Sequence, residues 1–76
     1  MELDRDHQIV EINLPARWQD RTLAQINVRR SYGISVLAIH RQSEFVVSPG
    51  ADVQFRAGDN LLVLGRQADI AALDQK

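Results

Sequence analysis

The chain has 76 residues, no cysteine and a formal net charge of −1 at pH 7, which together predict one small domain. Disulfides and a Cys-rich zinc site are excluded, and the two histidines lie far apart. The near-neutral charge gives no reason to expect nucleic acid as a partner. No apolar run approaches the roughly 20 residues of a membrane span, and the polar start is unlike a signal peptide. We expect a soluble, cytoplasmic domain that buries some apolar surface by self-association.

The first eight residues are polar and unpatterned. We therefore interpret 1–8 as the end of a linker and 9–76 as the domain. Residues 9–14 alternate between apolar and polar side chains, which predicts a half-buried strand closed by Pro15. Trp18 follows in a loop and is expected to fold back on the core.

A short helix is predicted after Thr22, because its hydroxyl suits the N-cap position. Residues 27–28 interrupt the helix before a second helical turn over 29–32. That turn is expected to stop at Gly33, since glycine adopts the left-handed conformation that follows a helix end.

Residues 34–41 are apolar on both faces, which is typical of a strand in the centre of a sheet. Strict alternation would put four of them on one face: Ile34, Val36, Ala38 and His40. Gln42 and Ser43 then make a tight connection into 44–48, which predicts a hairpin.

The strongest predicted strand is 61–64, which is apolar at every position and follows a tight turn over 57–60. Such a strand is expected to be covered on both faces. Residues 67–76 indicate a closing helix, since Ile70 and Leu73 are three positions apart with two alanines between them. The order is β-α-β-β-β-α, an α+β sandwich with helices packed on a mostly antiparallel sheet.

No catalytic constellation is apparent, so an enzyme is not expected. The glycines match neither a phosphate-binding loop nor a dinucleotide fingerprint, and there is no cysteine nucleophile. Asp52 and Asp59 fall in predicted turns, where aspartate commonly bonds nearby backbone amides. We interpret both as turn residues.

One polar group is more informative. It comprises two arginines and a tyrosine at a predicted helix end, and two residues at the end of the next strand: Arg29, Arg30, Tyr32, His40 and Arg41. The planar fork of arginine suits phosphate or carboxylate. Arginines near a helix C-terminus are also favoured by the helix dipole alone. A small-anion site and simple helix stabilisation both stay open.

Several short segments, in their order and spacing, resemble the TrkA-C (RCK C-terminal) domain. They are Leu14-Pro15, Arg21-Thr22-Leu23, Ile26, Arg29, Tyr32-Gly33-Ile34, Val36 to Arg41, Ser48-Pro49, Gly58-Asp59 and Leu61 to Gly65. The resemblance covers about Ile9 to Leu73. One departure is Asp20-Arg21-Thr22, where the family usually has Gly-Lys-Thr.

Domains of this family are the C-terminal lobes of cytosolic gating subunits of Trk and Ktr potassium transporters. They also occur attached to potassium channels and cation/proton antiporters. The resemblance implies a cytoplasmic regulatory domain, held at the membrane by its transporter or channel partner. Full subunits carry an N-terminal Rossmann lobe for ATP, ADP or NAD(H), so those nucleotides are not expected on this lobe.

In part of the family, two lobes pair as a homodimer and bind cyclic di-AMP in the cleft between them. We expect no other cofactor, and we assign no metal-binding residue. Carried over by position, the phosphate would be held by Arg29, with six further ligand-binding residues at Ile34, Ser35, Val36, His40, Val47 and Pro49. Ser35 replaces the asparagine common in that subgroup, so the two-sided amide contact with adenine is lost.

Two other functions are weighed against this one. The domain is alternatively a ligand-free dimerisation lobe that transmits conformational change to the transporter. A third possibility is divalent-cation sensing, which some channel-attached relatives perform. The carboxylates that would serve it form no recognisable cation loop in the sequence: Glu11, Glu44, Asp52 and Asp59.

Overall fold

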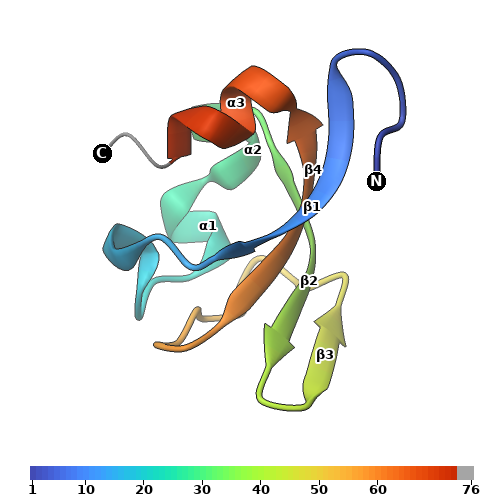
Figure 1. Cartoon of the computed structure of the whole chain (residues 1–76). Coiled ribbons are helices and arrows are strands. Elements are labelled where there is room, and N and C mark those ends of the chain that lie inside the picture. The colour runs from blue at the N-terminus through green and yellow to red at the C-terminus, as the bar shows by residue number, and fades with distance from the viewer. Residues whose placement is uncertain (74–76) are drawn as a thin grey trace.

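The computed structural model describes residues 1–73 and contains a four-stranded antiparallel sheet with short helices on one face (Figure 1). The strands are β1 (His7–Asn13), β2 (Ser35–Arg41), β3 (Glu44–Val47) and β4 (Asn60–Arg66), in the spatial order β1-β4-β2-β3. The helices are a 3-10 turn (Ala16–Trp18), α1 (Leu23–Ile26), α2 (Val28–Tyr32) and α3 (Gln67–Ala72). The predicted α+β class and antiparallel sheet are confirmed.

The two ends of the chain differ slightly from expectation. β1 begins at His7, two residues earlier than predicted, and the preceding segment folds back on it, with the Ile9 N–H donating to the Met1 carbonyl at 2.7 Å. The division into a linker and a domain stays a prediction. The predicted closing helix is present as α3, and Ile70 and Leu73 are buried. The remainder of the predicted closing helix, 74–76, lies outside the described residues.

Helices α1 and α2 form one interrupted helical segment, as the sequence predicts. The Thr22 hydroxyl accepts from the Gln25 N–H, and the Gln25 side chain accepts from the Thr22 N–H, which completes a capping box. Asn27 then adopts a left-handed conformation with φ 56°, which separates α1 from α2. Gly33 ends α2 at φ 75°, a conformation that costs glycine little.

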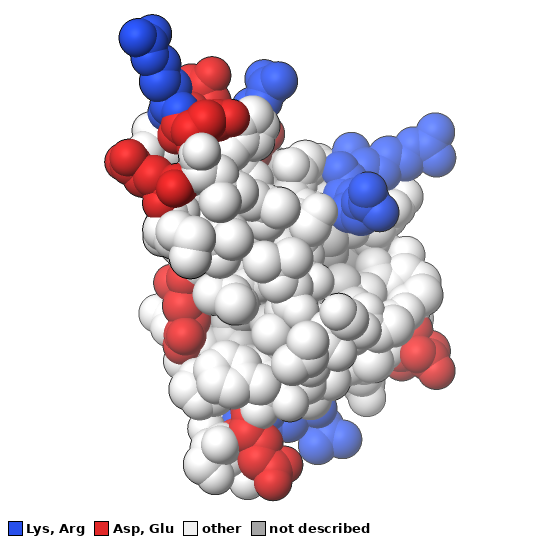
Figure 2. All heavy atoms as spheres, turned by 90° about the vertical axis from the view of Figure 1, so that its right-hand side faces the viewer, with Lys and Arg blue, Asp and Glu red and all other residues white. Residues whose placement is uncertain are grey.

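Strand β4 is central, between β1 and β2, as its apolar sequence indicates. Leu61 and Val63 point toward the helices and are fully buried, whereas Leu62 and Leu64 on the opposite face are only half-buried. The expectation of full cover on both faces is therefore wrong for the outer face. Figure 2 shows that face as largely uncharged, with charged side chains gathered near its margins.

A β-bulge in β2 changes which of its residues share a face. Val36 pairs with Val63 and Ala38 pairs with Leu62, so Leu37 is the extra residue. The predicted alternation holds up to Val36 and is wrong beyond it. The register puts Ala38 and His40 on the outer face, where Ala38 is nevertheless buried, and puts Ile39 on the helical side.

The core lies between the sheet and the helical layer. Trp18 is only 1% exposed and stacks on Phe55, with ring centroids 5.8 Å apart, so its predicted packing role is confirmed. Its ring also meets that of Tyr32 at 5.1 Å. Trp18 and Phe55 belong to the same buried cluster as Ile39 and Val63 of the sheet, and Tyr32 packs against that cluster.

Candidate functional site

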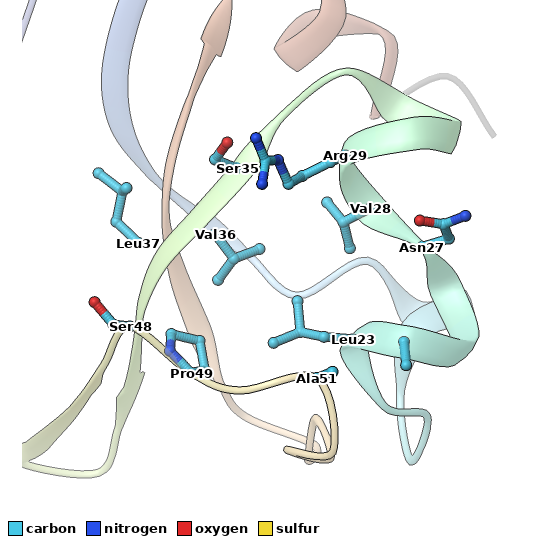
Figure 3. A pocket seen from close by; sticks show the side chains of 11 residues that line it. Leu23, Asn27, Val28, Arg29, Ser35, Val36, Leu37, Ser48, Pro49 and Ala51 are labelled. Carbon is cyan, nitrogen blue, oxygen red and sulfur yellow. The ribbon is translucent and has the colours of Figure 1, made fainter.

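A cavity of about 490 Å³ lies between α1, α2, the first half of β2 and the loop after β3 (Figure 3). This volume falls within the roughly 300–1,000 Å³ of typical small-molecule sites. We call it the ligand pocket. Its lining is mainly apolar, with one cation: Leu23, Ala24, Asn27, Val28, Arg29, Ser35, Val36, Leu37, Ser48, Pro49 and Ala51.

The ligand pocket exists because β3 pairs with only part of β2. The β3 register begins at Ala38, so within residues 1–73 no strand pairs with that edge of β2 before Ala38. The Ser48 N–H donates to the Leu37 carbonyl at 2.8 Å, and a positive φ of 50° at Ser48 turns the chain away from the sheet. The loop then crosses to α1, where the Ala24 N–H donates to the Ala51 carbonyl at 2.9 Å.

Arg29 supplies the positive charge of this pocket. Its side chain extends from α2 toward Ser35 on β2 (Figure 3). The guanidinium is exposed and forms no hydrogen bond or ion pair within residues 1–73. It therefore keeps all five N–H donors for a ligand. An apolar wall beside an unpaired arginine suits a ligand with a flat apolar ring and an anionic group.

The structure brings together four of the seven predicted site residues. Arg29, Ser35, Val36 and Pro49 line the ligand pocket. The other three lie elsewhere in this structure. Ile34 is 1% exposed in the core, and the His40 ring stacks on Phe45 with centroids 4.2 Å apart. Val47 is 72% exposed at the open edge strand.

The sequence interpretation did not include several lining residues. Leu23, Ala24 and Ala51 enter the pocket because the loop after β3 is held against α1 by backbone hydrogen bonds. Their small or apolar side chains give no signal that separates them from core residues. The N-cap at Thr22 marks where α1 begins, but it gives no signal of which residues of the helix line the pocket.

Arg41 does not belong to an anion site, contrary to one interpretation of the polar group. Its Nε and Nη2 donate to the two carboxylate oxygens of Asp59 at 2.9 and 2.8 Å. The Arg41 guanidinium holds the pKa of the Asp59 carboxyl below its usual value. Asp59 also accepts from the Arg56 N–H at 2.8 Å, which confirms its predicted role in the turn. This pair fixes the β4 turn and leaves Arg29 for a ligand.

Within residues 1–73, no group of three or more His, Asp or Glu side chains is placed to hold a metal ion. The scattered carboxylates weighed for cation sensing are therefore not brought together in the described part of the chain. None of the helices found there is long and apolar enough to cross a membrane.

Comparison with known proteins places this geometry in a family. The sequence model of the TrkA-C domain matches residues 7–76. The chain is 36% identical over its whole length to Ktr system potassium uptake protein C of Bacillus subtilis (strain 168), and it spans 34% of that protein.

Two solved structures share the fold. One is described as the RCK C domain of the potassium transport protein KtrA in complex with cyclic diadenosine monophosphate. It has a TM-score of 0.84 and 29% identity, over 91% of this chain and 81% of that one. The other is described as an RCK_C domain dimer of S. agalactiae BusR in complex with c-di-AMP. It has a TM-score of 0.75 at 20% identity, over 92% and 86% of the two chains, and shows the fold alone. The chain belongs to the TrkA-C domain family, whose RCK C-terminal domains are found in regulators of potassium transport.

Proposed function

We propose that this domain binds cyclic di-AMP between two copies of itself and thereby gates a potassium transporter or channel, or another cation transporter. The observation that carries the proposal is the unpaired Arg29 at the rim of a mainly apolar pocket. The likeness to a KtrA domain described in complex with this nucleotide supports the ligand. The domain acts by binding, not by catalysis.

The symmetry of the ligand explains why one pocket is half of a site. Cyclic di-AMP carries two phosphates and two adenines related by a two-fold axis. One ligand pocket offers a single free guanidinium, on Arg29, and one apolar wall that includes Val36 and Pro49. A two-fold dimer supplies each of these twice, so each phosphate meets one arginine and each base meets one wall.

Gating follows if the ligand binds one arrangement of the dimer better than another. The difference in affinity shifts the equilibrium between the arrangements, by about 1–3 kcal/mol in typical allosteric proteins. The relative from Bacillus subtilis is about three times as long as this chain, since the chain covers 34% of it. We propose that an N-terminal Rossmann lobe in the full-length protein passes this shift to a transporter at the cytoplasmic face of the membrane.

The proposal predicts different effects for two neighbouring arginines. Arg29→Ala should abolish the rise in melting temperature that cyclic di-AMP causes, because the phosphate loses its partner. Arg30→Ala is the matched control, since Arg30 is also exposed on α2 but does not line the ligand pocket. Both variants should melt like the parent without ligand. Equal nucleotide responses of the two variants would show that the phosphate is not held by Arg29.

The alternative of a ligand-free dimerisation lobe is favoured by one residue. Ser35 carries a single hydroxyl where an amide would both donate to and accept from a base. A stable dimer whose melting temperature no nucleotide changes would establish this alternative.

A further inference from the structure

The outer face of the sheet carries an apolar surface with no layer over it. The strand register places Ile9 opposite Leu64, and it places Leu62 and Val47 on either side of Ala38. Phe45 lies on the same face of β3 as Val47. Figure 1 shows the helices of the described chain on the opposite face. We call five of these residues the outer patch: Ile9, Phe45, Val47, Leu62 and Leu64.

The sequence of β4 is that of a strand covered on both faces. Such strands are apolar at every position, whereas a strand with one solvated face alternates between apolar and polar residues. The helical layer covers Leu61 and Val63 of β4 and leaves Leu62 and Leu64 half-buried. On the edge strand β3, the two residues of the outer patch are 53% and 72% exposed. A contiguous apolar surface of this kind marks an interaction site.

The charges around the outer patch favour an uncharged partner surface. Figure 2 shows charged side chains near the margins of this face rather than across it. Glu11 lies opposite Leu62 on this face, and its Oε2 is 3.4 Å from Nδ1 of His40, whose ring stacks on Phe45. Within residues 1–73, no block of like charge thus occupies the centre of the face. A second copy of the same face therefore fits it without electrostatic repulsion.

The outer patch adjoins the ligand pocket through Ser35. This residue pairs with Leu64, which puts it on the outer face, and it also lines the pocket. Two copies that meet through their outer patches therefore bring their pockets to the rim of one contact. A different protein on this face would leave a two-fold ligand without its second Arg29. Continuity with the ligand pocket thus favours a second copy as the occupant.

We propose that the outer patch packs face to face on the outer patch of a second copy, as the two sheets of a sandwich do about 10 Å apart. The choice of a second copy rests on the proposed function, to which the inference adds the surface where the copies meet. Four strands about 4.8 Å apart and about six residues long span roughly 20 by 20 Å. Two such faces bury on the order of 800 Å², below the roughly 1,200 Å² at which standard interfaces begin. The contact alone should therefore give a weak dimer, which a ligand bound by both copies strengthens.

Sedimentation equilibrium of the full chain without nucleotide, at concentrations from about 10 µM to about 1 mM, measures this dimer. Val47→Lys should raise the dissociation constant by about tenfold or more, because the dimer would bury an unpaired ammonium group. Val47 is 72% exposed, so the variant should keep the circular dichroism spectrum of the parent. Ala68→Lys is the matched control, since it adds the same charge at an exposed position of α3, on the helical side. Its dissociation constant should stay within about twofold of the parent.

Nuclear Overhauser effects between a ¹³C-labelled copy and an unlabelled copy locate the contact. The proposal predicts such effects between the methyl groups of Leu62, Leu64 and Val47 across the two copies.

Arg29→Ala separates the sheet contact from the nucleotide site. This variant should lose the response to cyclic di-AMP and keep the ligand-free dissociation constant of the parent. A dimer with the predicted Overhauser effects that does not bind cyclic di-AMP would contradict the proposed ligand and support the sheet contact. A chain that stays monomeric at about 1 mM, equal dissociation constants for Val47→Lys and Ala68→Lys, or Overhauser effects confined to the helical side would overturn the inference.

Discussion

Replacing Asp59, in the turn before β4, with asparagine should clearly destabilise the domain. Asp59 is 3% exposed and accepts three hydrogen bonds: two from the Arg41 guanidinium and one from the Arg56 N–H. Asparagine keeps the shape but loses the charge, and its amide NH₂ would meet one of the Arg41 donors. The half-buried Arg41 guanidinium would then lack its counter-ion.

The size of the effect follows from burial. Removing one partner of a fully buried ion pair costs about 3–5 kcal/mol. The Arg41 side chain is 20% exposed and can recover some hydration, so we expect about 2–3 kcal/mol for Asp59→Asn. A domain of 76 residues has about 4–11 kcal/mol of total stability. The melting temperature should therefore fall by about 10–20 °C.

Urea and thermal unfolding at pH 7, followed by circular dichroism, measure this cost. Asp52→Asn is the matched control, because Asp52 is exposed in a turn and lies outside every ion pair within residues 1–73. Its free energy of unfolding should stay within about 0.5 kcal/mol of the parent. If Asp59→Asn changes the free energy of unfolding as little as Asp52→Asn does, the Arg41–Asp59 ion pair does not stabilise the turn.

Acid should remove the same contribution. Because Arg41 lowers the pKa of Asp59 in the folded state, the stabilisation is complete above the unfolded value of about 3.9 and is lost as the pH falls through the folded pKa. The difference in unfolding free energy between the parent and Asp59→Asn should therefore be constant from pH 7 to about 5 and shrink below about 4. A difference that persists undiminished at the lowest pH would contradict this assignment.

Three further changes test the backbone and the pocket. In Gly65→Ala, the new methyl group would lie 2.7 Å from Ile34 Cγ2 in the core. We therefore expect the free energy of unfolding, measured in urea, to fall by about 1–3 kcal/mol. An unchanged midpoint would mean that the core rearranges to accept the methyl group. Asn27→Ala should lower the free energy of unfolding by about 1 kcal/mol or more, because Asn27 has a left-handed φ of 56°, whereas Asn27→Gly should be nearly neutral. Equal losses in the two variants would show that the left-handed conformation is not the cause. Ser35→Asn should tighten cyclic di-AMP binding by about fivefold through one added hydrogen bond, measured by calorimetry, and weaker binding would show that residue 35 does not face the base.

The local features of the helical segment could be predicted from the sequence because each depends on neighbouring residues. Thr22 caps α1 and the left-handed Gly33 ends α2, as expected, whereas only Asn27 interrupts the segment and α2 begins at Val28, one residue earlier than predicted. The bulge at Leu37 could not be predicted, since an inserted residue in an apolar strand leaves no local mark. The alternation of β2 was therefore wrong after Val36.

The candidate site was only partly predictable for a similar reason. The resemblance to a family led to Arg29, Ser35, Val36 and Pro49, which the fold does bring to one cavity. The partner of Arg41 lies 18 residues away along the chain. No local pattern distinguishes an arginine neutralised in this way from one that is free to bind a ligand.

The most direct test of the proposed function is a calorimetric titration of the purified domain with cyclic di-AMP, with ATP and cyclic di-GMP as controls. A symmetric site shared by two copies predicts saturable binding of cyclic di-AMP alone, at one ligand for every two chains. Binding of one ligand per chain would contradict the shared site. An absence of heat, together with an unchanged melting temperature, would contradict the ligand itself and leave a dimerisation lobe.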